Sequence, residues 1–264
     1  MTDLGADLFN RVAADYDRSV PFFATFGRRL VDWISPNPGT HVLDLGAGRG
    51  AVTAALLAAD CSVLAGDASP AMLDFLRETL LTTDTRTLNT RTLNTRILDA
   101  HHLDLPDSSF DLILSGFLLH ILDTDKAFTE IARVLKPGGV LAFSVPGHST
   151  DGGWWATYGR IVDDFTRRIR DVPHHEPVTW PERADRAGLR HVDQTTTEVS
   201  FPIDGPEAHW SWLMSHGNRW LHDALPEPDR TAFRDHVLRS LREHHPTNGT
   251  TLIAGAEFHR VIKP

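Results

Sequence analysis

Short apolar runs alternate with helical stretches along the first 150 residues of the chain. Runs of four to six mostly apolar residues that end at polar or glycine-rich segments are typical of strands buried on both faces. We expect five such strands, at residues 41–45, 62–66, 96–99, 110–115 and 140–145. Helical spacing separates several of them, at residues 51–59, 70–80 and 128–135. Because strand and helix alternate, the crossovers are expected to be right-handed and the sheet parallel, with helices on both faces.

Further elements flank this region. Apolar spacing predicts two N-terminal helices, at residues 9–16 and 22–34. Beyond residue 147 we expect a helix at 181–187, a strand at 190–199, a helix around 210–225, another around 233–241 and a last strand at 251–256. The predicted fold is therefore an α/β domain with an open, doubly wound, mostly parallel seven-stranded sheet and helical cap insertions.

Core and cap segments are expected to alternate within this single domain. The core comprises residues 36–146, 177–200 and 251–264, and the cap elements comprise residues 1–35, 147–176 and 201–250. Residues 85–89 repeat perfectly as residues 90–94. This tandem pentapeptide is too short for a solenoid, and we interpret it as a lengthened polar surface connection.

Composition narrows the range of partners. The 264 residues include 26 Lys and Arg against 35 Asp and Glu, which gives a net charge of −9. This balance argues against general affinity for nucleic acid or for anionic membranes, since phosphate-rich partners require a basic face. Cys61 is the only cysteine and can form no internal disulfide. There is no apolar stretch of 18 residues and no signal-like N-terminus, so we expect a soluble, cytoplasmic protein.

A glycine-rich segment carries the main chemical signal. Residues 44–50 follow the first predicted strand and precede a helix, where glycines let the backbone turn sharply and approach a ligand. Gly46, Gly48 and Ala51 also satisfy the dinucleotide-binding pattern. Asp67, 21 residues after Gly46, is placed to hold two ribose hydroxyls in either kind of protein. A nicotinamide-dependent oxidoreductase therefore remains an alternative at this point.

Two further acids favour a different cofactor. Asp44 at the strand end would repel a pyrophosphate, but it suits the ammonium group of a methionine moiety. Residues 99–101 would place an acid and a backbone N–H where an adenine edge can be read. The glycine segment also begins after forty residues of other structure, whereas many dinucleotide domains open with it.

The chain resembles the class I S-adenosylmethionine-dependent methyltransferases. Five segments match the motifs of that family in the right order: residues 44–50, 66–73, 99–101, 105–111 and 135–141. Residues 9–17 are similar to the N-terminal helix of the branch that contains the ubiquinone and menaquinone biosynthesis enzymes and related small-molecule methyltransferases. The resemblance covers residues 9–146 and fades beyond residue 147.

This resemblance implies a cofactor site for S-adenosylmethionine. The residues that would line its methionine moiety are Asp44, Gly46, Ala47 and Gly48. Ser115 would lie beside the methionine end, and Tyr16 would close over the cofactor. Asp67 would hold the ribose. The residues that would flank or read the adenine are Ala68, Met72, Asp99, Ala100 and His101.

The resemblance leaves few candidates for a general base. The family often has two adjacent histidines near residues 118–120, whereas only His120 is present here. Methyl transfer is an in-line displacement, so alignment and exclusion of water supply most of the acceleration, and a base is needed only for a hydroxyl or a carbon acid. His120 and His148 each follow a strand that should end at the ligand-binding edge, and they are the two candidates. No metal-ligand spacing is present, so no metal site is predicted.

Six of the seven tryptophans lie beyond residue 150. Aromatic-rich lids commonly enclose small apolar ligands, so the cap is expected to bind a small, partly apolar acceptor. The candidate acceptor contacts are Trp154, Trp155, Trp210 and His216. Oxygen is favoured as the methyl acceptor, with carbon or nitrogen as alternatives. A protein that binds the cofactor without methylating anything is a further alternative.

Overall fold

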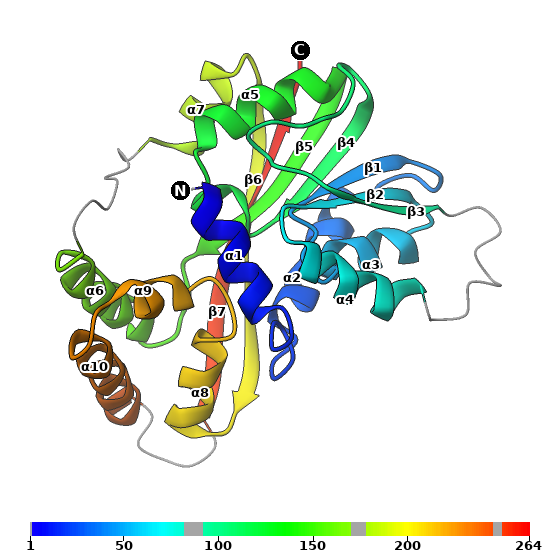
Figure 1. Ribbon diagram of the computed structural model, residues 1–264. Helices are drawn as coiled ribbons and strands as arrows, with labels where there is room; N and C mark the ends of the chain where they lie inside the picture. Colours follow the sequence, from blue (N-terminus) through cyan, green and yellow to red (C-terminus); the bar gives the residue numbers. More distant parts are fainter. Residues whose placement is uncertain (1, 82–91, 170–177, 245–249) are drawn as a thin grey trace.

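A seven-stranded sheet forms the centre of the protein (Figure 1). The structure, a computed structural model, describes residues 2–81, 92–169, 178–244 and 250–264. The strands are β1 His41–Leu45, β2 Ser62–Asp67, β3 Leu93–Ile97, β4 Phe110–Gly116, β5 Leu135–Gly147, β6 Arg190–Ile203 and β7 Thr250–Ile262. Their order is β3-β2-β1-β4-β5-β7-β6, with β1 to β5 parallel and β7 antiparallel to both of its neighbours. The predicted open, mostly parallel seven-stranded sheet is confirmed.

Helices cover both faces of this sheet (Figure 1). Those that pack on the sheet are α2 Phe22–Ile34, α3 Ala51–Ala58, α4 Pro70–Leu81, α5 Thr124–Val134 and α7 Trp180–Arg186. α2 lies within residues 1–35, which the sequence analysis assigned to the cap, but its apolar side packs on the sheet. Successive strand residues point to opposite faces, so Val42 packs in the apolar cluster with α2, α3 and α4 while Leu43 packs in the cluster with α5 and α7. Burial of each strand on both faces explains why the strands read as continuous apolar runs.

The cap helices gather at one end of the sheet. They are α6 Trp154–Thr166, α8 Gly205–Leu213, α9 Arg219–Ala224 and α10 Asp229–His244. Figure 1 shows them beside the ends of β6 and β7, which continue to pair beyond the end of β5. The helix expected around residues 210–225 is in fact two helices, α8 and α9, because residues 214–218 lie between them in turns. Among the described residues, no helix is long and apolar enough to cross a bilayer.

Several predicted boundaries were wrong. The first helix, α1, spans Thr2–Val12, and residues 13–18 form turns. The third strand was placed too late, because it spans Leu93–Ile97 and the bond from the Leu98 N–H to the Asp67 carbonyl is its last link to β2. The fifth strand begins at Leu135, since the Gly138 N–H donates to the Lys263 carbonyl instead of ending a helix. Most of the tandem repeat lies outside the described residues, and its last two residues begin β3.

The pairing of β5 with β7 generates a stability prediction. Gly147 and Gly255 face each other, and a Cβ at Gly255 would lie 1.7 Å from the carbonyl oxygen of His148. Because that oxygen belongs to the backbone, Gly255→Ala should lower the free energy of unfolding by about 1–3 kcal/mol. In the control, Gly159→Ala within α6, a Cβ meets no atom within 4 Å. That change should raise stability by about 0.5–1 kcal/mol. Chemical denaturation measures both, and an unchanged Gly255→Ala protein would contradict the strand pairing.

Candidate active site

The glycine segment turns the chain from β1 into α3. Gly46 and Gly48 have φ angles of +74° and +52°, which favour glycine. The N–H groups of Gly46 and Ala47 donate to the Gly66 carbonyl at 2.8 and 3.0 Å, which ties the turn to β2. A Cβ at Gly46 would lie 2.7 Å from the Leu118 side chain, whereas a Cβ at Gly48 would meet no atom within 4 Å. The open side at Gly48 is space that a bound cofactor can use.

Asp67 faces this turn from the end of β2. Its Oδ2 accepts the Gly48 N–H and its Oδ1 accepts the Ser69 N–H, each at 2.8 Å. Burial raises the pKa of Asp67, and these two hydrogen bonds act in the opposite direction. Each carboxylate oxygen keeps a second lone pair. The half-buried side chain can therefore accept the two hydroxyls of a ribose.

Asp44 lies buried behind the glycine turn. Its Oδ2 accepts the Thr53 hydroxyl at 2.5 Å, while its Oδ1 is buried without a partner among the described residues. Burial raises the pKa of Asp44 to about 7, although the hydrogen bond from Thr53 opposes the shift. A cation near this carboxylate would stabilise its charged form. The orphaned oxygen therefore fits the ammonium group of a methionine moiety.

The segment after β3 provides the groups for an adenine. Oδ1 of Asp99 accepts both the backbone N–H and the Nδ1–H of His101, at 2.9 Å. Nε2 of His101 accepts the Asp123 N–H at 3.1 Å, so both ring nitrogens are occupied. The exposed Oδ2 of Asp99 and the Ala100 N–H make no hydrogen bond to a described residue, and these two groups can read a purine edge. His101 thus orients Asp99 and has no free ring nitrogen of its own.

Three other expected cofactor residues lie around the glycine turn and Asp67. Met72 is buried and packs with Leu8 and Val12 of α1, and Ala68 is exposed beside Asp67. Ser115 is buried at the end of β4, where its hydroxyl donates to the Leu45 carbonyl at 2.9 Å. Ser115 therefore joins β4 to β1, and its hydroxyl is already used.

The N-terminal segment lies over the glycine turn. Arg49, for which the sequence analysis predicted no role of its own, donates to the carbonyls of Ala13 and Ala14 at 3.2 Å and of Tyr16 at 2.9 Å. Its guanidinium also lies 4.5 Å from the centre of the Phe75 ring. Burial is the main cause of the raised pKa of Tyr16, and the negative charges of Asp17 and Asp67 raise it further. Arg49 thus holds Tyr16 close to Asp67.

Hydrogen bonds also fix α1 and α2. The Asn10 side-chain oxygen accepts the Ser69 hydroxyl at 2.6 Å, which links α1 to the start of α4. Arg11 pairs with Asp223 of α9 at 3.0 Å. Asp17, at φ +54°, accepts the first N–H groups of α2, and burial raises its pKa to about 6. Figure 1 accordingly shows α1 between α4 and the cap helices.

The two candidate bases differ in their surroundings. His120 follows β4 and reaches solvent, yet crowding desolvates its ring and lowers its pKa to about 4, so the ring is neutral near pH 7. The Phe117 ring lies 6.4 Å away, centre to centre. His148 follows β5 and is exposed, and its side chain makes no hydrogen bond or ring contact with a described residue. The structure therefore brings His120, but not His148, to the aromatic rings beside the glycine turn.

An aromatic cluster that sequence reasoning missed lies next to this turn. It is defined by Phe22, Phe23, Phe117 and Trp212, and we call it the aromatic box. Phe117 lies 5.4 Å from Phe22 and 5.7 Å from Phe23, and Trp212 lies 5.2 Å from Phe22. Phe117 has a φ of +52°, and its N–H donates to the carbonyl and hydroxyl of Ser144. Such a conformation in a bulky residue is uncommon and is often found at functional sites.

Three of the expected acceptor contacts pack inside the cap. Trp154 is buried beside His209, and Trp210 is buried against Phe233. The indole N–H of Trp155 donates to the Ile253 carbonyl at 2.7 Å. In this structure the three tryptophans pack within the cap, and their role as acceptor contacts stays a prediction. His216, in contrast, lies 5.7 Å from Phe23 of the aromatic box.

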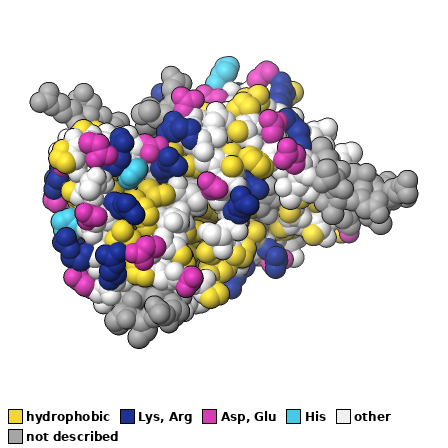
Figure 2. Space-filling model, turned by 60° about the horizontal axis from the view of Figure 1, so that its bottom comes forward, with side chains coloured by type: hydrophobic (Ala, Val, Ile, Leu, Met, Phe, Trp, Pro, Cys, Tyr) yellow, Lys and Arg dark blue, Asp and Glu magenta, His cyan; other side chains and the backbone are white. Residues whose placement is uncertain are grey.

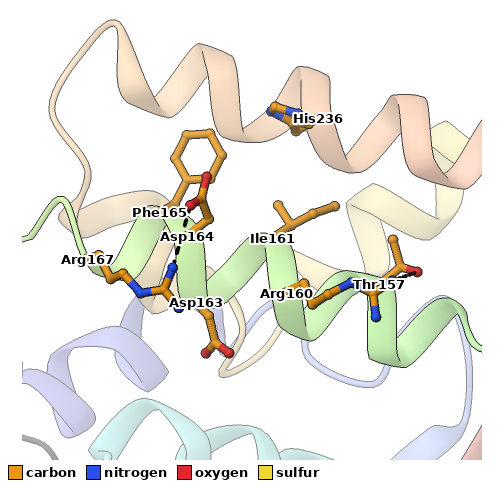
Figure 3. Close-up of a pocket in the computed structure, with 8 residues that line it drawn as sticks. All are labelled: Thr157, Arg160, Ile161, Asp163, Asp164, Phe165, Arg167 and His236. Carbon is orange, nitrogen blue, oxygen red and sulfur yellow. Dashed lines mark hydrogen bonds and ion pairs between the residues drawn. The ribbon is translucent and has the colours of Figure 1, made fainter.

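An open cleft of about 430 Å³ lies elsewhere, between α6 and α10. Figure 3 shows Phe165 and Ile161 of α6 pointing toward α10, which carries His236, whereas Asp163 points away. Its lining includes no residue of the glycine turn or of the aromatic box. Among the residues the structure describes, no three His, Cys, Asp or Glu side chains gather as metal ligands.

Four features of the fold and the site occur together: the strand order, the antiparallel β7, the glycine turn after β1 and the acid at the end of β2. Together they define a class I S-adenosylmethionine-dependent methyltransferase. Comparison with known proteins agrees. Residues 43–143 match the family described as methyltransferase domain. Aklanonic acid methyltransferase of Streptomyces sp. (strain C5) is 32% identical over 182 residues, which cover 67% of this chain and 78% of the relative. The chain therefore belongs to the methyltransferase family.

Two further similarities extend along nearly the whole chain. Nocamycin O-methyltransferase of Saccharothrix syringae is 27% identical over 259 residues, covering 90% of each chain. A solved structure, phosphoethanolamine N-methyltransferase 2 of Haemonchus contortus with S-adenosyl-L-methionine, aligns with a TM-score of 0.53 at 21% identity, over 91% of this chain and 52% of that one. The cofactor is S-adenosylmethionine. Membership of this family excludes the alternative that the protein is a nicotinamide-dependent oxidoreductase.

Asp67 generates the first prediction for this site. Asp67→Ala should weaken binding of S-adenosylhomocysteine more than about 100-fold, since two charge-assisted hydrogen bonds contribute about 1.5–3 kcal/mol each. Calorimetry measures the affinity, and circular dichroism checks the fold. Asp74→Ala is the control, because Asp74 is an exposed acid that pairs with Arg77 on α4. Equal affinity of the Asp67→Ala and wild-type proteins would show that another group holds the ribose.

Asp44 generates a pH prediction. With a pKa of about 7 in the free protein, this carboxyl becomes protonated as the pH falls below 7. The charged form attracts the ligand ammonium, so affinity for S-adenosylhomocysteine should fall by up to about tenfold per pH unit below 7 and level off above it. Asp44→Asn should bind more weakly and show a flat profile in the same titrations. A wild-type affinity that is equal at about pH 6 and about pH 8 would rule out this contact.

Proposed function

We propose that this protein methylates a small, partly apolar metabolite, most readily at an oxygen atom. The observation that carries the proposal is the position of the aromatic box. β1 and β4 are neighbours in the sheet, but the chain leads away from them in opposite directions, which makes this the switch point where ligands of such sheets bind. The glycine turn follows β1 and Phe117 follows β4. The glycine turn of the cofactor site and the aromatic box therefore meet at the same edge of the sheet.

The rings of the box suit an apolar molecule. Phe23 and Phe117 are only half-buried, and so is Tyr16, which stacks on Phe23 at 4.5 Å. Aromatic faces left partly open beside a polar cofactor site are a common lining for small ligands. Apolar rings around the reacting atoms also exclude water, which favours a displacement that depends on alignment.

His120 is the group best placed to take a proton. Its neutral ring can accept the proton of an acceptor hydroxyl, and its contact with solvent lets that proton leave. Bound S-adenosylmethionine supplies the electrophilic methyl group. In the cofactor half, Asp67 and Asp44 hold the ribose and the ammonium group, the Asp99 carboxylate and the Ala100 N–H read the adenine, and Tyr16 closes the site.

A macromolecular acceptor is disfavoured by the surface. Figure 2 shows Lys and Arg side chains interspersed with Asp and Glu on the face in view, with apolar patches between them. With a net charge of −9, the chain has little electrostatic attraction for RNA or DNA. The similarity to an O-methyltransferase over 90% of each chain supports a small oxygen acceptor.

Product analysis with a carbon-13 methyl donor tests this function. We expect labelled products in a library of hydroxyaromatic compounds, quinols, carboxylic acids and amines, with the label on oxygen by NMR and a mass gain of one methylene unit. With an oxygen acceptor, His120→Gln should slow turnover at least about 100-fold while leaving cofactor affinity unchanged. Total RNA and a protein extract are the controls. Label that enters only RNA or protein would refute the proposal.

A further inference from the structure

Two polar ring atoms, one in the aromatic box and one next to it, have no hydrogen-bond partner among the described residues. His216 is 7% exposed and Trp212 is 2% exposed. Neither Nε2 of His216 nor Nε1 of Trp212 is hydrogen-bonded to any described residue. Their rings are in contact, with centres 4.6 Å apart, yet the two nitrogens do not bond to each other. An indole N–H and an imidazole nitrogen, on two rings in contact, are therefore buried without hydrogen-bond partners in the described part of the chain.

Leaving such groups unpaired is costly. A buried polar group without a hydrogen bond destabilises a fold, so each case in a native structure calls for an explanation. The structure contains others, such as Trp154 Nε1 and Thr166 Oγ1, but those lie on α6, which contributes no ring to the aromatic box. His216 and Trp212 are distinguished by their neighbours, because both touch the rings that adjoin the switch point.

Ring contacts lead from this pair to the cofactor half of the site. Phe23 lies 5.7 Å from His216 on one side and stacks on Tyr16 at 4.5 Å on another. Tyr16 is close enough to Asp67 for that charge to raise its pKa. His216 and Trp212 therefore lie on the far wall of the aromatic box, across Phe23 from the cofactor residues.

The ring of His216 is neutral in this environment. Burial lowers its pKa to about 3, so near pH 7 the imidazole carries no charge. A neutral imidazole has one N–H donor and one bare nitrogen that accepts. With the proton on Nδ1, Nε2 accepts a hydrogen bond and the indole N–H of Trp212 donates one. A hydroxyl group is the simplest partner that both donates and accepts.

We infer that His216 and Trp212 form the polar end of the acceptor site and select a flat, ring-containing acceptor that carries a hydroxyl group. The hydroxyl donates to His216 Nε2 and accepts from Trp212 Nε1, while the ring of the acceptor lies against Phe23 and Phe117. The inference rests on the proposed function, but it concerns binding alone. His216 is a specificity-determining residue, and proton removal at the reacting atom remains with His120.

Binding of three matched probes tests the inference. 2-Naphthol can donate and accept, 2-methoxynaphthalene can only accept, and naphthalene can do neither. In the presence of S-adenosylhomocysteine, we expect the wild-type protein to bind 2-naphthol about tenfold more tightly than 2-methoxynaphthalene by calorimetry. It should bind 2-methoxynaphthalene more tightly than naphthalene, because only the ether oxygen can accept from Trp212.

Variants separate the two contacts. His216→Leu should abolish the preference for 2-naphthol over 2-methoxynaphthalene, and His216→Gln, which keeps an acceptor, should restore much of it. Trp212→Phe should abolish the preference for 2-methoxynaphthalene over naphthalene. Trp210→Phe is the matched control, since Trp210 lies on the same helix but packs in the cap, and it should leave both preferences unchanged. Affinity for S-adenosylhomocysteine should be the same in all variants.

The outcomes are distinct from those that test the proposed function. Equal binding of 2-naphthol and 2-methoxynaphthalene by the wild type, no binding of either, or an unchanged preference in His216→Leu would overturn the inference and leave small-molecule methylation intact. Label that enters only macromolecules, together with an intact 2-naphthol preference, would instead refute the proposed function. If His216→Leu fails to fold, His216→Gln and Trp212→Phe still decide the matter.

Discussion

The carboxylate of Asp67 connects the parts of this protein that must stay together. It receives one N–H from the glycine turn after β1 and one from Ser69, which immediately precedes α4. Ser69, which donates the second, also donates its hydroxyl to Asn10 of α1. The turn, α4 and the N-terminal helix are thereby held in one arrangement. Arg49 of the glycine turn adds a further link, because its guanidinium donates to the backbone carbonyl of Tyr16. The position of the site depends on this short chain of hydrogen bonds.

The elements that sequence predicted well are those with local causes. The buried strands β1, β2 and β4 appear as apolar runs because both of their faces are covered. Asp44 and Asp67 could be recognised because they lie close to the glycine turn in the sequence, one just before it and one at the end of the next strand. The edge strand β3 was misplaced since only one neighbour pairs with it and its residues are half exposed. The full lengths of β6 and β7 depend on their mutual pairing, which no local pattern encodes.

The aromatic box escaped prediction for a different reason. The aromatic box joins α2, the end of β4 and α8, which are far apart in the sequence, and it depends on the left-handed backbone of Phe117. The abundance of tryptophan drew attention to the second half of the chain, but composition does not show which indoles contact the rings of α2 and which pack against other cap helices. Trp212 was therefore overlooked while Trp154 and Trp210 were favoured.

The way in which the cap helices join the sheet has an evolutionary consequence. α8, α9 and α10 all lie in the connection between the paired strands β6 and β7, and α6 lies in the connection that follows β5. An insertion or exchange within these two connections changes the cap without cutting a pair of strands. Relatives built in this way can therefore differ in their cap helices while the sheet and the glycine turn stay the same.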